Sequence, residues 1–354
     1  MDNFLPHQNQ KISRYKAIDL LGYFQAIEKQ IKRFEVKTGF NELDKYLSGG
    51  LHEGLYVLGA ISSLGKTTFA LQLADQIAIR HQDVIFFSLE TSRYELMAKS
   101  ISRYTYELNR LARTEDGKNL LAKDLQQILD SQRYTSYSSH EKQTITDAIT
   151  EYKKIASHIF ICDGGDSYKR ISANSIREIV EEHIQVTGQK PVVFVDYLQI
   201  LAPVDIHITD KQSIDINIFE FKKMSRDFGI PIFVVSSFNR NNYDEPVSMN
   251  SFKESGAIEY SSDVLFGLQY FGMDYEENEL PIERSRRLRE LLKANIEKKC
   301  NKTPIQIELK CLKNRNGCQF ALPFQVMPAY SHFEFKNIYD DTNLYGSNYK
   351  IQKF

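Results

Sequence analysis

The sequence predicts an α/β protein built on a mostly parallel sheet with helices on both faces. Short apolar segments alternate with longer stretches of helical periodicity, and several of the apolar segments are continuous, which is typical of strands buried on both faces. Ser-x-x-Glu patterns beginning at Ser92, Ser138 and Ser175 predict where three helices begin. The predicted strands are Leu55–Ala60, Val84–Leu89, Ile159–Asp163, Val192–Leu198, Ile232–Ser236, Val264–Gln269 and Ile305–Lys313.

The composition is that of a globular protein with one large or two ordinary domains. The chain has 354 residues, of which 42% are hydrophobic and 26% are charged, and its formal net charge of −1 excludes a globally basic nucleic-acid coat. The N-terminal segment lacks an apolar signal, and no apolar run has the length of a membrane span. Four cysteines are too few for a disulfide framework and suit a reducing compartment. We therefore expect a cytoplasmic protein with no membrane partner.

The predicted organisation is one main domain with short flanking segments. Residues 1–15 are polar and are expected to form a flexible N-terminus. Apolar residues at three- and four-residue steps from Ala17 to Phe34 predict an amphipathic linker helix over 16–35, which packs on its own domain or on a neighbouring subunit. The remaining predicted ranges are a main domain over 36–336, an all-helical insertion at about 104–157, a second insertion at about 271–304 and a C-terminal tail over 337–354.

The second insertion has an uneven distribution of charge. An acidic stretch, Asp274–Glu279, is followed by a basic segment, Arg284–Lys299. Such a basic segment either binds nucleic acid or forms an amphipathic helix with a solvated charged face. Leucines at positions 288, 291 and 292 favour the amphipathic helix.

The first predicted strand leads directly into a phosphate-binding loop. The segment Gly59-Ala-Ile-Ser-Ser-Leu-Gly-Lys-Thr-Thr68 approximates the pattern G-x-x-x-x-G-K-[ST], with Ala60 in place of the first glycine. Small residues let backbone N–H groups surround a phosphate, while Lys66 reaches the β- and γ-phosphate oxygens and Thr67 holds Mg²⁺. ATP and Mg²⁺ are therefore the expected cofactors. The predicted nucleotide-binding residues are Ala60, Ser62, Ser63, Leu64, Gly65, Lys66, Thr67 and Thr68.

Two carboxylates follow other predicted strands. Asp196 ends the apolar run Pro191-Val-Val-Phe-Val-Asp196, where it is placed to hold Mg²⁺ together with Thr67. Glu90 ends the run that begins at Val84. From its position alone, Glu90 either activates the water that attacks the nucleotide or is an acidic residue in the first turn of the next helix.

The motifs together resemble the ATPase domain of DnaB-type replicative helicases, a RecA-like P-loop family. The resemblance covers residues 36–335 as an ordered series of short blocks. The blocks are Thr38-Gly-Phe-Asn-Glu-Leu-Asp44, Gly49–Gly54, Ala60–Thr67, Phe87-Ser-Leu-Glu90, Asp196-Tyr-Leu-Gln199, Ser236-Ser-Phe-Asn-Arg240, Glu254-Ser-Gly-Ala-Ile-Glu259 with Asp263, and Lys313-Asn-Arg-Asn-Gly317.

The resemblance implies a role for each matching position. Glu90 is expected to activate the hydrolytic water, and Lys66 to act with it on the phosphates. Lys313 and Arg315 are expected to reach across a subunit interface to the γ-phosphate bound by a neighbour. The sensor motif adds Ser236 and Ser237 to the nucleotide-binding residues.

The resemblance also implies a partner and an assembly. DnaB-type helicases form hexameric rings that move on single-stranded DNA, so we expect a homo-oligomer and a primase or helicase-loader partner. Loops that line the pore bind DNA phosphates without sequence preference. The matching positions are Arg240, Lys253, Glu254, Gly256 and the polar loop Val204–Asn217. From its composition alone, this loop either lines the pore or is an ordinary disordered surface connection.

The sequence departs from the family pattern in four respects. Ser237 replaces the usual Gln after the sensor serine, and Lys253 replaces an Arg, which keeps the charge but loses the bidentate geometry. About 35 residues precede the main domain, which predicts a helicase that works without the usual helical N-terminal domain or as one part of a split primase–helicase system. The two insertions predict a divergent branch, of the kind carried on mobile genetic elements.

The predicted function is therefore an ATP-dependent helicase that translocates on single-stranded DNA during replication. Two alternatives remain: a RecA-like recombinase or strand-annealing ATPase, and a nucleotide-gated module that recruits replication proteins without unwinding. The blocks Asp196–Gln199 and Lys313–Arg315 argue against the recombinase.

Overall fold

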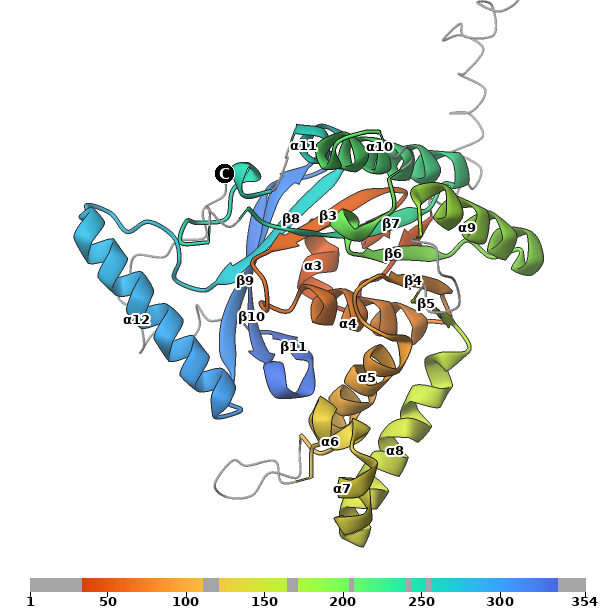
Figure 1. Cartoon of the computed structure of the whole chain (residues 1–354), viewed down its shortest axis with the longest axis vertical. Coiled ribbons are helices and arrows are strands. Elements are labelled where there is room, and N and C mark those ends of the chain that lie inside the picture. Colours follow the sequence, from red (N-terminus) through yellow and green to blue (C-terminus); the bar gives the residue numbers. More distant parts are fainter. Residues whose placement is uncertain are drawn as a thin grey trace, which may run out of the picture. The chain divides into compact units, whose positions relative to one another are not determined.

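A nine-stranded sheet forms the centre of the fold (Figure 1). The computed structural model describes residues 34–110, 121–163, 171–203, 207–239, 243–252 and 256–336. The strands are β3 (Gly54–Ala60), β4 (Val84–Ser88), β5 (Ile159–Cys162), β6 (Val192–Asp196), β7 (Pro231–Ser237), β8 (Val264–Tyr270), β9 (Ile305–Asn314), β10 (Phe320–Met327) and β11 (His332–Phe335). Their order is β11-β10-β9-β8-β3-β7-β6-β4-β5.

The sheet has a parallel part and an antiparallel part. From β8 to β5 every neighbouring pair is parallel, whereas β9, β10 and β11 are joined by antiparallel pairing. The predicted mostly parallel sheet is confirmed, and all seven predicted strands are present. The strands β10 and β11 were not predicted, because Pro323 interrupts the pattern of β10 and β11 is very short.

Helices cover both faces of the sheet. The helices are α3 (Asn41–Tyr46), α4 (Lys66–Ala78), α5 (Arg93–Leu108), α6 (Leu125–Leu129), α7 (Ser131–Ser136), α8 (Ser139–Ala156), α9 (Ala173–Thr187), α10 (Asp210–Phe228), α11 (Gly256–Ser261) and α12 (Pro281–Cys300). Figure 1 shows α9, α10 and α11 on one face and α4 on the other. On the first face Val180 of α9 and Phe221 of α10 belong to the same buried apolar cluster as Val193 of β6. A short separate sheet pairs β1 (Glu35–Val36) with β2 (Leu51–His52).

Two of the three predicted helix starts are confirmed. Ser92 and Ser138 each accept a hydrogen bond from the backbone N–H three residues later, and Ser138 completes a reciprocal capping box with Glu141. The third prediction was wrong, because α9 begins at Ala173 and its capping residue is Ser172, which accepts from the N–H of Ser175. A serine suits both the cap and the first turn, so the spacing alone does not identify the cap.

The predicted polar loop Val204–Asn217 is shorter than expected. Residues 204–206 lie outside the described residues, and α10 already begins at Asp210. Thr209 and Gln212 form a reciprocal capping box that ends the loop and starts the helix. The second half of the predicted loop is therefore helical. The predicted linker helix over 16–35 and the C-terminal tail lie outside the described residues, apart from Phe34 and Glu35.

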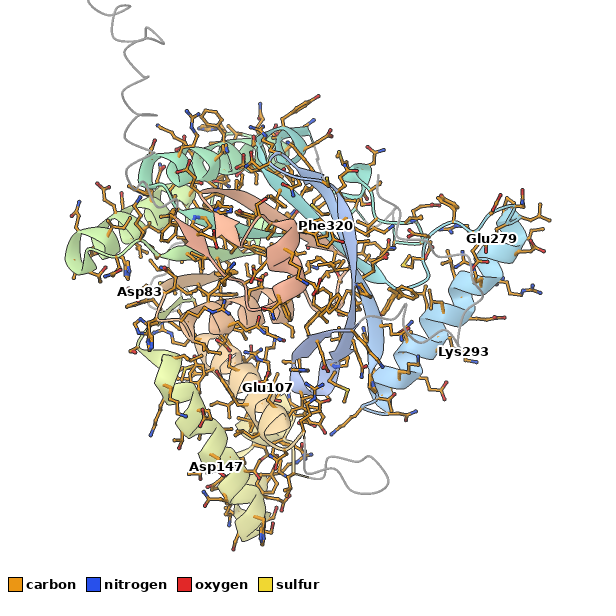
Figure 2. The ribbon with its side chains drawn as sticks, turned by 180° about the vertical axis from the view of Figure 1, so that it is seen from behind. Asp83, Glu107, Asp147, Glu279, Lys293 and Phe320 are labelled. Atoms are coloured by element: carbon orange, nitrogen blue, oxygen red, sulfur yellow. The ribbon has the colours of Figure 1, made fainter. Side chains whose placement is uncertain are left out.

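Helical segments extend from the sheet on different sides. The helices α5, α6, α7 and α8 form one group, and α12 is separate from them; Figure 2 labels Asp147 on the first and Lys293 on the second. The basic segment predicted at Arg284–Lys299 lies within α12. In the described part of the chain, no helix is both long and apolar enough to cross a membrane.

A buried polar cluster lies where the second insertion leaves the sheet. Glu308 of β9 accepts a hydrogen bond of 2.9 Å from the side-chain amide of Gln269 on β8, and Gln269 also donates to Asp274. Lys310 is paired with Asp274. Burial is the main cause that raises the pKa of Glu308 to about 7, and Asp274 adds to it, while Lys310 and Gln269 act in the opposite direction.

Protonation of Glu308 predicts a specific dependence of stability on pH. The folded protein holds a proton that the unfolded chain releases above about pH 4.5, so this contribution is complete below that pH and is lost as pH rises through 7. We expect Glu308→Gln to remove up to about 3 kcal/mol of the difference in unfolding free energy between pH 5 and pH 8. Urea unfolding at both pH values measures this difference. Glu290→Gln, at an exposed position on α12, is the control; an unchanged pH dependence in Glu308→Gln contradicts the assignment.

Candidate functional site

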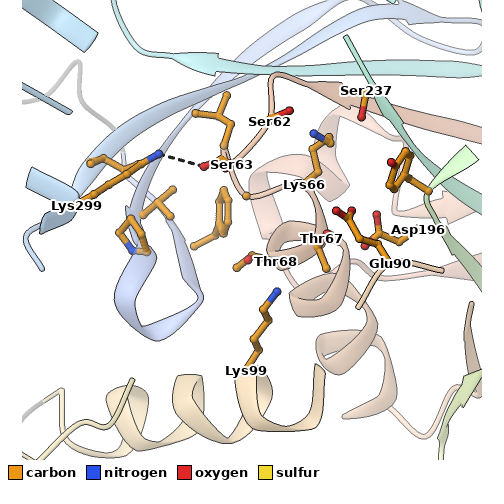
Figure 3. A pocket seen from close by; sticks show the side chains of 17 residues that line it. Ser62, Ser63, Lys66, Thr67, Thr68, Glu90, Lys99, Asp196, Ser237 and Lys299 are labelled. Atoms are coloured by element: carbon orange, nitrogen blue, oxygen red, sulfur yellow. Dashed lines mark hydrogen bonds between the residues drawn. The ribbon is translucent and has the colours of Figure 1, made fainter. Parts of the chain in front are cut away.

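A cavity of about 370 Å³ opens where the parallel strands end and α4 begins (Figure 3). This volume lies within the range of small-molecule sites. Polar and charged residues form one side of the cavity and apolar residues form the other. The polar lining consists of Ser62, Ser63, Lys66, Thr67, Thr68, Glu90, Lys99, Asp196, Tyr197, Ser237 and Lys299, with Leu64 and Gly65 from the loop.

The predicted phosphate-binding loop connects β3 to α4. Gly65 precedes the helix with φ +99°, and Ser63 also has a positive φ of +60°. An added Cβ at Gly65 would lie 3.1 Å from the ring of Phe333, so both backbone conformation and space favour glycine there. Lys66 starts α4, and its ammonium donates 3.2 Å hydrogen bonds to the carbonyls of Ala60 and Ile61. The unpaired N–H groups at this helix start make the loop an anion-binding site.

Burial and neighbouring carboxylates act in opposite directions on the pKa of Lys66. Burial is the main cause that lowers the pKa of its ammonium, and the carboxylates of Asp196 and Glu90 act against it. Ala60, at the end of β3, is fully buried and contributes its carbonyl to Lys66 rather than a surface of the cavity. The backbone carbonyls of the loop therefore fix the position of the Lys66 ammonium.

Asp196 ends β6 beside the hydroxyl of Thr67. Its side chain is 1% exposed. Burial is the main cause that raises the pKa of the Asp196 carboxyl; the hydrogen bond with Thr67 lowers it and the nearby Glu90 raises it further. Its Oδ2 atom is buried without a hydrogen-bond partner. A buried carboxylate oxygen without a partner needs a compensating donor or cation.

Thr67 and Asp196 fit the requirements of a magnesium ion. Mg²⁺ prefers oxygen ligands, and it commonly combines one protein carboxylate with phosphate oxygens. The orphaned Oδ2 belongs to Asp196, which lines the cavity together with Thr67 and the phosphate-binding loop. These two residues are therefore the ones that would hold the ion.

Glu90 lies just after β4 and is exposed at the cavity. Figure 3 shows its carboxylate next to Asp196.

Lys99 of α5 contributes a second ammonium to the cavity, which was not predicted from the sequence. Burial lowers the pKa of Lys99, and Asp196, Glu95 and Glu90 act against it. The amphipathic pattern of α5 does not show which of its side chains faces the site, so the sequence offers no signal for Lys99.

The two predicted sensor serines differ in their positions. Ser237 lines the cavity, whereas Ser236 is fully buried and does not. Gln199 connects both to the strand of Asp196: its amide donates to the Ser236 hydroxyl at 2.9 Å, and its oxygen accepts from the Ser237 N–H at 3.4 Å. The block Asp196–Gln199 thus links the ends of β6 and β7.

The apolar side of the cavity comes from the antiparallel strands. Gln72 of α4 positions Phe333 through two hydrogen bonds, donating to its carbonyl at 2.8 Å and accepting from its N–H at 2.7 Å. Sequence reasoning missed this surface because β10 and β11 were not predicted. The apolar lining residues are Ile305, Val326, Pro328 and Phe333.

Lys313 and Arg315 do not line the cavity of their own chain. The ammonium of Lys313 donates to the carbonyl of Glu259, and Arg315 donates to the carbonyl of Tyr260 at 2.7 Å. Arg315 also lies 3.8 Å from the carboxylate of Asp263. The two basic residues therefore contact the end of α11.

The predicted DNA-binding positions are mostly beyond the described residues. Arg240, Lys253 and Glu254 lie outside them. Gly256 is the first residue of α11 and is exposed, and an added Cβ would meet no atom within 4 Å.

A family model described as the DnaB-like helicase C-terminal domain matches residues 35–335 of the chain. The replicative DNA helicase DnaB of Helicobacter pylori is 28% identical over 327 residues, which cover 84% of this chain and 61% of that protein. The DnaB of Geobacillus stearothermophilus is 26% identical over 249 residues, which cover 68% of this chain and 49% of that protein. The chain thus spans less than two thirds of the length of these relatives.

Solved structures share the fold. An ATPase domain aligns with a TM-score of 0.67 at 20% sequence identity, covering 90% of this chain and 98% of that domain. A DnaB-like replicative helicase, described with its interactions with primase, aligns with a TM-score of 0.66 at 20% identity, covering 90% of this chain and 66% of that one. The RecA-like fold expected from the sequence is confirmed.

The position of Lys99 predicts a contribution to nucleotide affinity. A half-buried ammonium attracts the phosphates that enter the cavity, so we expect Lys99→Ala to weaken ADP binding about tenfold. Calorimetric titration with ADP and Mg²⁺ measures the affinity. Lys153→Ala, which removes an exposed ammonium from α8, is the control. Equal affinity in wild type and Lys99→Ala excludes this role.

Proposed function

This chain belongs to the DnaB-like helicase C-terminal domain family, and we propose that it is an ATP-driven DNA helicase that translocates on single-stranded DNA during replication. The observation that carries the proposal is the cavity that brings Lys66, Thr67, Asp196 and Glu90 together at the start of α4. These are the groups that phosphoryl transfer to water requires. This activity predicts a cytoplasmic protein.

In the proposed reaction the phosphates of ATP lie over the N-terminus of α4. Lys66 binds the β- and γ-phosphate oxygens, and Thr67 and Asp196 hold Mg²⁺. Mg²⁺ held by these residues would supply positive charge to the phosphates. Glu90 orients the attacking water and accepts its proton. Its exposure at the cavity supports this role, because water reaches the carboxylate directly.

The proposed site is completed by a second copy of the chain. Lys313 and Arg315 contact α11 of their own chain rather than their own cavity. We assign them to the γ-phosphate of the neighbouring subunit, where they stabilise charge in the transition state. A closed set of such head-to-tail interfaces is a ring, and a hexamer is the assembly that the family resemblance implies.

The contacts of α11 offer a route from DNA to the ATP site. The helix begins at Gly256, directly after the segment proposed to bind DNA, and its last carbonyls bind Lys313 and Arg315. A shift of α11 on binding DNA therefore moves the groups that act on the neighbour's ATP. The similar DnaB-like helicase is described with primase, and we propose a primase or a helicase loader as a protein partner.

Replacing Glu90 by Gln tests the proposed chemistry. The amide keeps the shape of the side chain but accepts no proton, so we expect Glu90→Gln to bind ATP with affinity similar to wild type and to lose ATP turnover by a factor of 100 or more, at the lower end of about 10²–10⁴-fold for general-base catalysis. We also expect wild type, but not the variant, to separate a forked DNA duplex in the presence of ATP and Mg²⁺. Full turnover in Glu90→Gln removes Glu90 from the mechanism, and ATP hydrolysis without strand separation in wild type contradicts the helicase assignment.

Mixing two inactive variants tests the completion of the site in trans. In a mixed assembly of Glu90→Gln and Arg315→Ala, some interfaces combine an intact Glu90 with an intact Arg315 from the neighbour. We expect the mixture to recover turnover that neither variant shows alone. Mixing Glu90→Gln with Lys66→Ala is the matched control, because both changes lie in the same cavity and every interface then lacks one of them. Equal rates in the two mixtures contradict the assignment in trans.

A further inference from the structure

The inserted helix α12 reaches the phosphate-binding loop through one side chain. The ammonium of Lys299, in the last turn of α12, donates a 3.1 Å hydrogen bond to the carbonyl oxygen of Ser63. The two residues are 236 positions apart in the sequence. Figure 3 shows Lys299 approaching the loop from the side opposite to Glu90 and Asp196.

Tyr270 holds the ammonium in place. Lys299 donates a second hydrogen bond, of 2.9 Å, to the Tyr270 hydroxyl, and its Nζ lies 5.3 Å from the centre of that ring. Tyr270 is 5% exposed and ends β8, so it is fixed by the sheet. Because Tyr270 already holds the Lys299 side chain, the hydrogen bond to the Ser63 carbonyl costs little additional side-chain entropy.

The bond to Ser63 determines the direction of one peptide group in the loop. The Ser63–Leu64 peptide is trans, so its N–H points away from its carbonyl. Since the carbonyl points to Lys299, the Leu64 N–H points away from Lys299. Figure 3 shows Lys66 on the other side of Ser63 from Lys299. Ser63 also has a left-handed φ of +60°, a conformation that is unfavourable for a non-glycine residue and persists where surrounding contacts support it.

We propose that Lys299 is a positioning residue for nucleotide binding, which anchors the Ser63 carbonyl so that the Leu64 N–H is directed at the phosphates. The inference rests on the proposed function, because it needs a nucleotide in the cavity. It gives the 271–304 insertion a role in ATP binding. Lys299 acts through the loop, so ADP and ATP are affected alike.

The test compares nucleotide affinities of the full chain. We expect Lys299→Ala to weaken both ADP and a non-hydrolysable ATP analogue about tenfold, since a hydrogen bond from a charged donor is lost. Lys299→Arg keeps a cationic donor and is expected to restore most of the affinity. Tyr270→Phe, which releases the ammonium without removing it, is expected to give a smaller loss. Lys298→Ala, its exposed neighbour on α12, is the matched control and is expected to bind as wild type.

The possible failures are distinguishable. Wild type that binds neither nucleotide contradicts the proposed function itself. Undiminished affinity in Lys299→Ala, or a loss for the ATP analogue alone, overturns the positioning role while leaving the proposed function intact. Thermal unfolding of each variant provides a second readout: a lower midpoint in Lys299→Ala with unchanged nucleotide affinity also overturns the inference, because it assigns Lys299 to stability alone.

Discussion

The candidate site depends on the shared carboxyl edge of four parallel strands. Because β3, β4, β6 and β7 run in the same direction, the residues that follow them meet at one edge of the sheet, where α4 presents its unpaired N–H groups. The loop, Glu90, Asp196 and Ser237 lie together for this reason. Any change that alters the strand order would separate them.

Much of this edge was predictable because its signals are local. A glycine, a lysine and a threonine between a strand and a helix identify the loop, and an apolar run that ends in Asp196 identifies the second strand. Lys99, Lys299 and Phe333 were not predictable in this way. Each reaches the cavity from an element whose own pattern reports only that it is a helix or a strand, so its contact depends on long-range packing.

The antiparallel strands of the sheet supply the apolar wall of the cavity and the connection to the second insertion. They bring Phe333 and three other apolar side chains to one wall of the cavity, and the insertion between β8 and β9 brings Lys299. The far end of β9 carries Lys313 to the carbonyls of α11. The strands β8 and β9 thus connect the cavity, the insertion and the groups proposed to act on a neighbouring subunit.

The most direct test of the proposed ATP-driven ring motor is the rate of ATP hydrolysis with and without single-stranded DNA, together with the native mass of the same sample. We expect a hexamer whose turnover rises strongly when single-stranded DNA is added, because α11 connects the proposed DNA-binding segment to Lys313 and Arg315, which are proposed to act on the neighbour's ATP. A monomer, or an oligomer whose turnover does not respond to DNA, would contradict it.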